Sequence, residues 1–438
     1  MASLVGRASL GGSSLLDLGL TALRVARPPS ILVLGDADFA YTLALDAALR
    51  DCALAHPPVL STSAYETEDE LVQRYPHAPE AMATLAQRGV SVRCGVDART
   101  IASHYGQSRF DRIVFNLPQS PPAPKARNQI QRHRALLRDF CGSAAGALAP
   151  RGELWITLLS GQGGTPLDPV SRVSGDTWQL QEQAAAAGLL VTGVASADLE
   201  ALAAAGYHAT GRRKEGLSLG MARKSKGLVV HVLAPEGSPL SSAQKIDGGS
   251  SSQLEAGGSS ISSGSLGAGA PPAATSNRPT VTPSDDTMAI PSDDTTAIPS
   301  DEGVAAIGIA PLEHTLDNSF WIDGPDDAPS LSALLDTASA ALDPAEAHTL
   351  ADEPTLVDAY QRPEDGRRAR TYRFVYRSQH LALGRDRALA LNAKVCEALA
   401  AALGGEHRNP VAHAAAMAHA EADGGGEGLK RPHEEDPA

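Results

Sequence analysis

The sequence predicts an α/β chain of two domains, in which a three-layer sandwich precedes a smaller α+β domain. Short apolar runs alternate with amphipathic helical patterns from Ile31 to about Pro235. Residues 236–309 are then dominated by Gly, Ser, Ala and Pro, and ordered patterns return from about Pro311 to His407. Strands that alternate with helices are typical of a mostly parallel sheet with helices on both faces.

The first domain, placed at residues 30–235, contains seven predicted strands. Its opening run, Ile31–Leu34, is apolar throughout, as expected of a strand buried on both faces. Gly35 permits a turn, and Asp38 is placed to cap a helix from Phe39 to about Arg50. The other strands are predicted at 58–63, 90–94, 110–115, 152–159, 189–194 and 227–233, with helices at 68–88, 129–148 and 178–187.

The second domain, placed at residues 310–408, is predicted to hold strands at 314–322, 355–360 and 370–376 and a helix at 386–403. In the segment RTYRFVYR (370–377), strand alternation puts Arg373 and Arg377 on one face of a sheet. The aromatic residues between them then point to the other face, where they are expected to form the core.

Three segments fall outside these domains. Residues 1–29 are predicted to be a flexible extension, with a short helix at 15–23 or an organelle transit peptide as alternatives. Residues 236–309 repeat PSDDTMAI and PSDDTTAI without an apolar face, which predicts a disordered linker. Residues 409–438 are predicted to be a disordered tail.

The composition of the chain limits which kinds of binding partner are expected. The chain has a formal net charge of −14, but residues 1–235 hold 23 basic and 20 acidic side chains, a balance of +3. An anionic partner for the first domain is therefore compatible with the acidity of the whole chain. The four cysteines lack CxxC spacing and the 13 histidines lack HExxH spacing, so neither a disulfide framework nor a metal site is predicted. No apolar run reaches the length of a membrane span, so no membrane partner is expected.

Polar residues follow four successive strands of the first domain: the Gly35–Phe39 turn, Glu66, Asp97 and Asn116. Ligands of such sheets bind beyond the carboxyl ends of the strands. An acid after the second strand suits ribose hydroxyls, Asp97 suits an adenine amino group, and Asn116–Pro118 offers acceptors for a substrate N–H. Each is also an ordinary strand-end residue, and a plain β-turn-α packing unit explains the opening stretch equally well. Together they favour S-adenosylmethionine over a nicotinamide cofactor, because the glycine fingerprint is incomplete.

Five segments resemble the 25S rRNA uridine-N3 methyltransferase family: LGDADFAYTLAL (34–45), TEDELVQRYP (67–76), CGVDART (94–100), FDRIVFNLPQS (110–120) and RGELWITLL (151–159). The segments HTLDNSFW (314–321), LVDAY (356–360) and RTYRFVYRS (370–378) are similar to the ferredoxin-fold domain that ends phenylalanyl-tRNA synthetases. The pairing of the two, together with GQGGTP (161–166) and AGYHATGRR (205–213), resembles the ferredoxin-fold anticodon-binding domain-containing protein 1 family.

The resemblance implies a Rossmann-like methyltransferase domain joined to a ferredoxin-like domain, and it implies roles for particular residues. The S-adenosylmethionine loop would comprise Gly35, Asp36, Ala37, Asp38 and Phe39, with Glu66 toward ribose and Asp97 toward adenine. Asn116 and Pro118 would orient the uridine whose N3 is methylated. Two residues depart from the family pattern: Ala37 stands for a second loop glycine, and Gln119 stands for a histidine that is a candidate base.

Basic side chains are candidates for RNA contacts, because they neutralise phosphates. We predict Arg132, Arg212, Arg213, Arg373 and Arg377 in this role. The favoured function is methylation of large-subunit rRNA. A catalytically inactive RNA-binding or ribosome-assembly factor and a tRNA methyltransferase are the alternatives. We expect a cytoplasmic protein, with the nucleolus or an organelle as alternatives.

Overall fold

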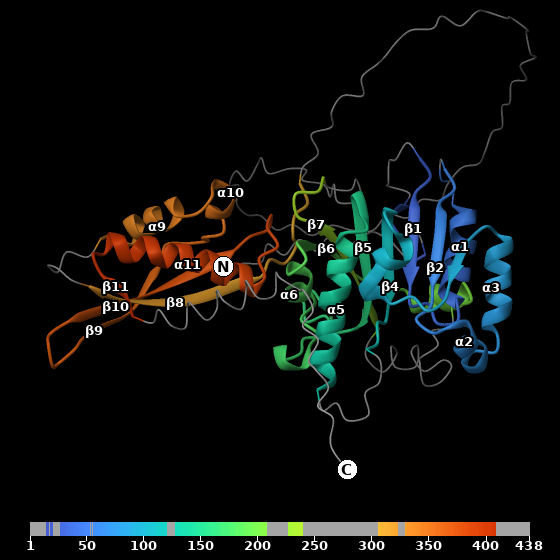
Figure 1. The fold of residues 1–438 in the computed structure, drawn as a ribbon, viewed down its shortest axis with the longest axis horizontal. Helices are drawn as coiled ribbons and strands as arrows, with labels where there is room; N and C mark the ends of the chain where they lie inside the picture. Colours follow the sequence, from blue (N-terminus) through green and yellow to red (C-terminus); the bar gives the residue numbers. More distant parts are fainter. Residues whose placement is uncertain are drawn as a thin grey trace, which may run out of the picture. The chain divides into compact units, whose positions relative to one another are not determined.

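A computed structural model describes residues 15–16, 18–20, 27–52, 54, 56–120, 128–207, 227–239, 305–322 and 329–408. These residues form a seven-stranded and a four-stranded sheet (Figure 1). The predicted tail and the central part of the predicted linker, residues 240–304, lie outside the described residues.

The seven-stranded sheet has the strand order β3-β2-β1-β4-β5-β7-β6. Strand β7 is antiparallel to β5 and β6, whereas the other neighbours that pair are parallel. The order reverses between β1 and β4, which is where sheets of this kind bind ligands. The strands are β1 (Ser30–Leu34), β2 (Val59–Ser63), β3 (Ser91–Arg93), β4 (Phe110–Asn116), β5 (Leu148–Leu159), β6 (Leu189–Ser196) and β7 (Leu228–Pro235). All seven predicted strands and the predicted Rossmann-like, mostly parallel sheet are confirmed.

Helices pack against both faces of this sheet. Ile31 and Val33 of β1 belong to one buried cluster, which includes residues of α1 and α3, whereas Leu32 and Leu34 belong to another, which includes residues of α4, α5 and α6. Burial on both faces explains why the β1 run is apolar at every position. The helices are α1 (Ala40–Asp51), α2 (Glu68–Arg74), α3 (Ala78–Gln87), α4 (Ile101–Tyr105), α5 (Gln129–Ala145), α6 (Leu180–Ala185) and α7 (Leu199–Ala204).

The predicted flexible extension is wrong for the residues described within it. Leucines 15, 16, 18 and 20 are buried in the same cluster as Tyr41. The Tyr41 hydroxyl donates to the Leu15 carbonyl at 2.6 Å, and buried Arg112 donates to the Leu18 carbonyl at 2.9 Å. The described part of the predicted 15–23 helix consists mainly of turns. The spacing of these leucines by three and four positions suits a helix, yet they lie mainly in turns and pack into the core.

Both described ends of the predicted linker are ordered, so its boundaries are also corrected. Pro239 and Ala305 form an isolated antiparallel bridge, and the Ala306 amide donates to the Ser238 carbonyl at 2.7 Å. Residues 236–239 and 305–309 therefore do not belong to a disordered segment, because backbone hydrogen bonds fix the positions where the linker leaves and returns.

The four-stranded sheet is antiparallel, with the order β11-β8-β10-β9. Its element sequence, β-α-β-β-α-β with one extra short helix, is ferredoxin-like and confirms the predicted fold class. Helices α9 and α11 lie on one face of the sheet (Figure 1). The elements are β8 (Glu313–Ile322), α9 (Leu331–Ala340), α10 (Pro344–Ala347), β9 (Thr355–Gln361), β10 (Arg368–Arg377), α11 (Arg385–Ala402) and β11 (Glu406–His407). Within the described ranges, no helix is both long enough and apolar enough to cross a bilayer.

Candidate active site

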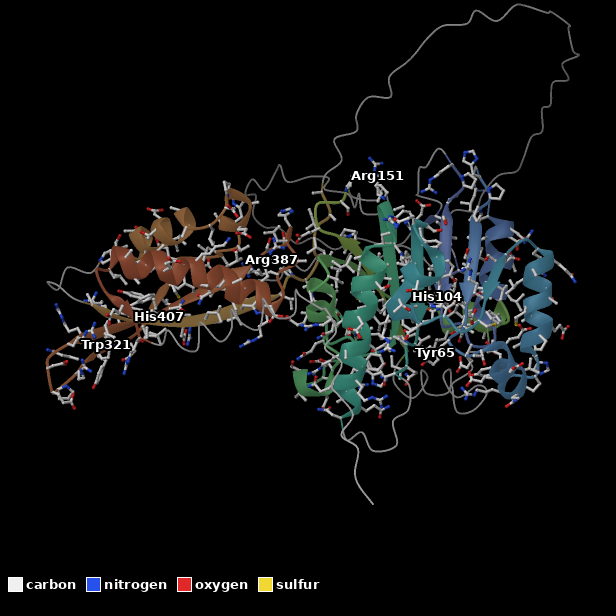
Figure 2. All side chains as sticks on the ribbon, viewed as in Figure 1. Tyr65, His104, Arg151, Trp321, Arg387 and His407 are labelled. Carbon is white, nitrogen blue, oxygen red and sulfur yellow. The ribbon has the colours of Figure 1, made fainter. Side chains whose placement is uncertain are left out.

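Backbone hydrogen bonds connect the carboxyl ends of β1, β2 and β3. The Asp36 amide donates to the Ser63 carbonyl at 3.0 Å, and the Gly95 amide donates to the Glu66 carbonyl at 2.8 Å. Tyr65 marks this edge of the sheet in Figure 2, and Arg151, in the first half of β5, marks the opposite edge. The structure thus brings together the four predicted strand-end segments.

The turn after β1 requires glycine at its first position. Gly35 has φ +66°, a left-handed conformation that side chains other than glycine adopt at a cost. A Cβ atom at this position would lie 2.8 Å from Cε2 of Phe115 on β4. The backbone of the turn therefore runs closely over the end of β4, at the point where the strand order reverses.

Two carboxylates of this turn occupy the N-terminus of α1. Asp36 accepts from the amide of Thr42 at 2.7 Å and from its hydroxyl at 2.6 Å. Asp38 accepts from the Ala40 amide at 3.2 Å, which agrees with its predicted capping role. The pKa of Asp36 is raised to about 7, chiefly by burial and in part by the nearby Asp38, whereas the hydrogen bonds from Thr42 oppose the rise. A cofactor phosphate placed here would face two acidic side chains, because amides that could bind it already donate to Asp36 and Asp38.

The other two members of the turn pack inward. The Phe39 side chain is fully buried in the core, and Ala37 packs partly against the same cluster. Phe39 also takes a left-handed conformation with φ +62°. Because the side chains of Asp36 and Phe39 are both used inside the domain, this turn presents mainly its backbone to a ligand.

The two predicted nucleoside-binding acids are each held by an arginine. Glu66 is 6% exposed, and its Oε1 lies 2.7 Å from Nη1 of Arg74. The side chain of Asp97 is 28% exposed and forms a two-pronged ion pair with Arg99. That arginine holds the pKa of Asp97 below its usual value. Both carboxylates are oriented at the carboxyl edge of the sheet.

Asn116 is oriented by Thr157 of β5. The Thr157 hydroxyl donates to Oδ1 of Asn116 at 2.6 Å, and the Thr157 carbonyl accepts from the Leu117 amide at 2.9 Å. Among the described residues, Nδ2 of Asn116 is buried without a hydrogen-bond partner. Leu117 has φ +48°, Pro118 is buried and Gln119 is exposed. A strained turn that is fixed at two points, with an unused donor, is a typical feature of binding sites.

Tyr65 is an additional candidate that the sequence prediction does not include. It directly precedes Glu66 and is 42% exposed, which is unusual for a large aromatic side chain. The pKa of Arg99 is raised chiefly by Asp97 and in smallest part by Tyr65, which places the tyrosine near that ion pair. The signal in the sequence is weak, because tyrosine is also common in strands.

The predicted RNA-binding arginines have different outcomes. Arg132 is half-buried on α5, and Arg212 and Arg213 lie outside the described residues. Arg373 and Arg377 share a sheet face, opposite to the buried Tyr372, Phe374 and Tyr376, as predicted. Each is paired with an acid of β8: Arg373 with Asp317 at 2.7 Å and Arg377 with Glu313 at 3.4 Å. The four cysteines are free, and the described residues contain no group of three side chains able to hold a metal ion.

The chain is similar in sequence to known proteins. Residues 32–211 match the family described as BMT5-like, rRNA (uridine-N3-)-methyltransferase BTM5-like. The chain is 33% identical over 193 residues to the human ferredoxin-fold anticodon-binding domain-containing protein 1 and 35% identical over 191 residues to its mouse homolog. These alignments cover 44% and 43% of this chain and 29% of each relative, so the chain matches less than a third of their length.

Two solved structures also align with about half of this chain. TrmN from Thermus thermophilus is 17% identical with a TM-score of 0.30, and 53% of this chain and 52% of that chain are covered. The ribosomal protein L11 methylase from Lactobacillus delbrueckii subsp. bulgaricus is 11% identical with a TM-score of 0.27, over 50% and 76%. The fold assignment itself follows from the strand order of this chain. Residues 32–211 are thus similar to the BMT5-like family, and a ferredoxin-like sheet follows them in the chain.

Proposed function

We propose that this chain is an S-adenosylmethionine-dependent RNA methyltransferase that acts on N3 of uridine in large-subunit rRNA. The observation that carries the proposal is the Asn116–Pro118 turn, fixed to Thr157 beside the acid-lined strand ends of a BMT5-like domain. The match to an rRNA methyltransferase family supports the RNA substrate.

The residues present fit this cofactor better than a phosphate-containing one. Asp36 and Asp38 occupy the N-terminal amides of α1 that would otherwise bind a pyrophosphate. S-adenosylmethionine has no phosphate, and its sulfonium is cationic. The backbone of the Gly35–Asp38 turn would hold its amino-acid end, Glu66 its ribose hydroxyls and Asp97 its adenine amino group. When bound, the cofactor supplies an activated methyl group, so the chain must mainly position the substrate.

Asn116 and the carbonyls of Leu117 and Pro118 would hold the uridine. Its N3–H lies between two carbonyl oxygens on the Watson–Crick edge, so the base must be unpaired or flipped out of a helix to react. The unpartnered Nδ2 of Asn116 is a donor for one base carbonyl. A main-chain carbonyl of the turn can accept a hydrogen bond from N3–H and so orient the base, but the proton itself must leave to solvent as N3 takes the methyl group. A cytosine presents an amino group in place of one carbonyl, and that group would meet the Asn116 donor unfavourably.

The test is labelled methyl transfer by the full chain to purified rRNA and tRNA, beside Asn116→Ala. We expect label in rRNA and a loss of about 10- to 1,000-fold in the variant, as for other positioning donors. Label in tRNA alone would establish the tRNA alternative. RNA binding without transfer, and without cofactor binding in a calorimetric titration, would establish the non-enzymatic alternative, which Ala37 and Gln119 favour.

A further inference from the structure

Several buried polar atoms without hydrogen-bond partners belong to segments that meet beyond the ends of β4 and β5. In the described parts of the chain, these atoms are Nδ2 of Asn116, Oγ of Ser120, Nε2 of His133 and Oγ of Ser160. Asn116 ends β4, Ser160 follows β5, and His133 is in the first half of α5. Buried polar groups in folded proteins are ordinarily paired, so a group of unpaired ones indicates that a ligand supplies the partners.

The position of His133 along α5 places it beyond the end of β4. The helix runs back along the sheet, since the Ala147 carbonyl just after it accepts from the Phe110 amide at the start of β4 at 2.9 Å. Phe140 of the helix packs on Phe115, the last residue but one of β4, with ring centroids 4.7 Å apart. His133 precedes Phe140 by seven positions, which is roughly 10 Å of helix. A strand covers that length in about three residues, so His133 lies level with the turn that follows β4.

The His133 ring is fixed with Nε2 as an acceptor. Its Nδ1 lies 2.8 Å from the main-chain carbonyl oxygen of Gln129, one turn earlier in α5. Because a carbonyl oxygen only accepts, Nδ1 carries the ring proton, and Nε2 of the neutral imidazole keeps a free lone pair. The ring also stacks on Trp178, with centroids 4.2 Å apart and planes at 9°. The Trp178 amide donates to the Gln162 carbonyl at 2.7 Å, which anchors the stack to the loop after β5.

The surroundings of His133 favour its neutral form. It is 3% exposed, and burial lowers its pKa, against the hydrogen bond from Nδ1 and with a further lowering by the charge of Arg132. Two acids of the segment that packs on the ring are not paired with it: Asp168 lies 2.9 Å from His231, and Asp176 is exposed. When the imidazole takes up a proton, the face of the stacked indole stabilises the cation.

Four acids at the same edge of the sheet are already in use. Asp36 and Asp38 accept from amides of α1, and Glu66 and Asp97 are paired with arginines. Residues 116–120 supply only the side chains of Asn, Leu, Pro, Gln and Ser, none of which is a base at neutral pH. In this set of groups, His133 is the one with a free basic nitrogen.

We propose that His133 is the general base that takes the proton from N3 of the bound uridine. This inference rests on the function proposed above and adds the group through which the proton leaves. The Asn116 side chain alternates with Phe115, which faces α5, so it lies on the opposite side of the sheet. A uracil ring seated over the end of β4 is then between Asn116 and His133.

The step balances without any further reactant. N3 gives its proton to Nε2 of His133 and its electron pair to the methyl carbon, whose bond to sulfur breaks. The imidazolium then releases the proton to solvent, and the neutral imidazole is restored. Proton removal by a positioned histidine contributes roughly 100- to 10,000-fold to the rate of such reactions.

The experiment measures single-turnover methyl transfer by the full chain to purified large-subunit rRNA from about pH 5 to about pH 9. The variants are His133→Gln and His133→Ala, and the second is also assayed with added imidazole. His77→Gln is the matched control, because His77 is exposed and its side chain makes no capping hydrogen bond at α3. Calorimetric titration of S-adenosylmethionine and thermal unfolding show whether each variant binds the cofactor and is folded.

We expect both His133 variants to lose roughly 100- to 10,000-fold in rate at neutral pH, with cofactor affinity unchanged. The wild-type rate should rise with pH while Nε2 loses its proton and level off above the pKa of His133, which is below the ordinary 6.5. In the variants this step should be absent, and the rate should rise with hydroxide instead. Added imidazole should restore part of the His133→Ala rate, which a purely structural role of His133 would not allow. His77→Gln should behave as the wild type.

The outcomes separate this inference from the function on which it rests. Transfer by the wild type together with a folded His133→Gln variant of equal rate and pH profile would overturn the role of His133 alone. A slow variant that keeps the wild-type pH profile and gains nothing from imidazole would also overturn it, because His133 would then serve only the packing of α5. Absence of transfer by the wild type would overturn the proposed function and this inference with it.

Discussion

Thr157 holds Asn116 and Leu117 from the neighbouring strand. Its hydroxyl lies 2.6 Å from Oδ1 of Asn116, and its carbonyl lies 2.9 Å from the Leu117 nitrogen. Strand β5 thereby fixes both the side chain and the backbone of the turn that ends β4. Because Thr157 is itself fully buried, its role is to position Asn116 and not to touch the substrate.

Replacing Thr157 with valine tests this role, since valine has the same shape without the hydroxyl. We expect the methyl-transfer rate to fall by about 10-fold or more, because the Asn116 amide loses its fixed orientation. Cofactor affinity should remain unchanged. Thr157→Ser should restore the rate. Single-turnover transfer and calorimetric titration measure the two quantities separately. A folded Thr157→Val variant with full rate would show that Asn116 does not need this hydrogen bond.

Substitution of Gly35 by alanine should abolish cofactor binding. The new Cβ would meet the Phe115 ring at 2.8 Å, in a backbone conformation that costs alanine about 1–2 kcal/mol. The turn must then shift away from β4. Calorimetric titration of S-adenosylmethionine measures the loss, and urea unfolding confirms that the variant is folded. Gly89→Ala is the control, because Gly89 also has a positive φ but has open space around it. Unchanged cofactor affinity in Gly35→Ala would show that this turn does not bind the cofactor.

The buried Asp36 carboxyl predicts a pH-dependent stability. Its pKa is about 7 in the folded chain against an ordinary 3.8, so between these values the folded state keeps a proton that the unfolded state has lost. The free energy of unfolding should therefore fall as pH rises through this window, by up to about 1.4 kcal/mol per pH unit, and level off above about pH 7. Asp36→Asn lacks this proton and should lack this contribution. Urea unfolding of both proteins from about pH 5 to about pH 8 checks it, and a stability difference independent of pH would contradict it.

Because the N-terminal leucines are buried, substitutions of leucines within residues 15–20 should lower the stability of the folded chain. Leu20 is 2% exposed, so Leu20→Ala should lower the free energy of unfolding by about 2–5 kcal/mol. Val72→Ala is the control, because Val72 is 49% exposed on α2 and its truncation should change stability by no more than about 0.5 kcal/mol. Similar urea midpoints for the two variants would show that the segment is dispensable.

Local patterns were sufficient to predict most of the fold. The ILVL run of β1 indicates burial on both faces, and the alternation in RTYRFVYR correctly separates Arg373 from Tyr372. Residues at strand ends could be assigned to one edge because parallel strands bring their carboxyl ends together. The sequence therefore placed Glu66, Asp97 and Asn116 at the same edge of the sheet without any knowledge of their partners.

Contacts between distant residues could not be predicted in this way. Thr157 lies 41 positions from Asn116, and the pairing depends on the exact register of β4 and β5. The stacking of His133 on Trp178 likewise joins α5 to the segment after β5. Asp36 looks like a ligand-binding acid in the sequence, but the structure shows that its carboxyl caps α1. Burial of Leu18 and Leu20 in turns follows from tertiary packing, because their spacing in the sequence suggests only a short surface helix.

The most direct test of the account identifies the modified nucleoside. Large-subunit rRNA is incubated with the full chain and S-adenosylmethionine, digested to nucleosides and analysed by mass spectrometry, with Asn116→Ala in parallel. We predict 3-methyluridine with the wild-type chain and little or none with the variant. Absence of 3-methyluridine, or an equal amount with Asn116→Ala, would contradict the assignment of this turn as the uridine site.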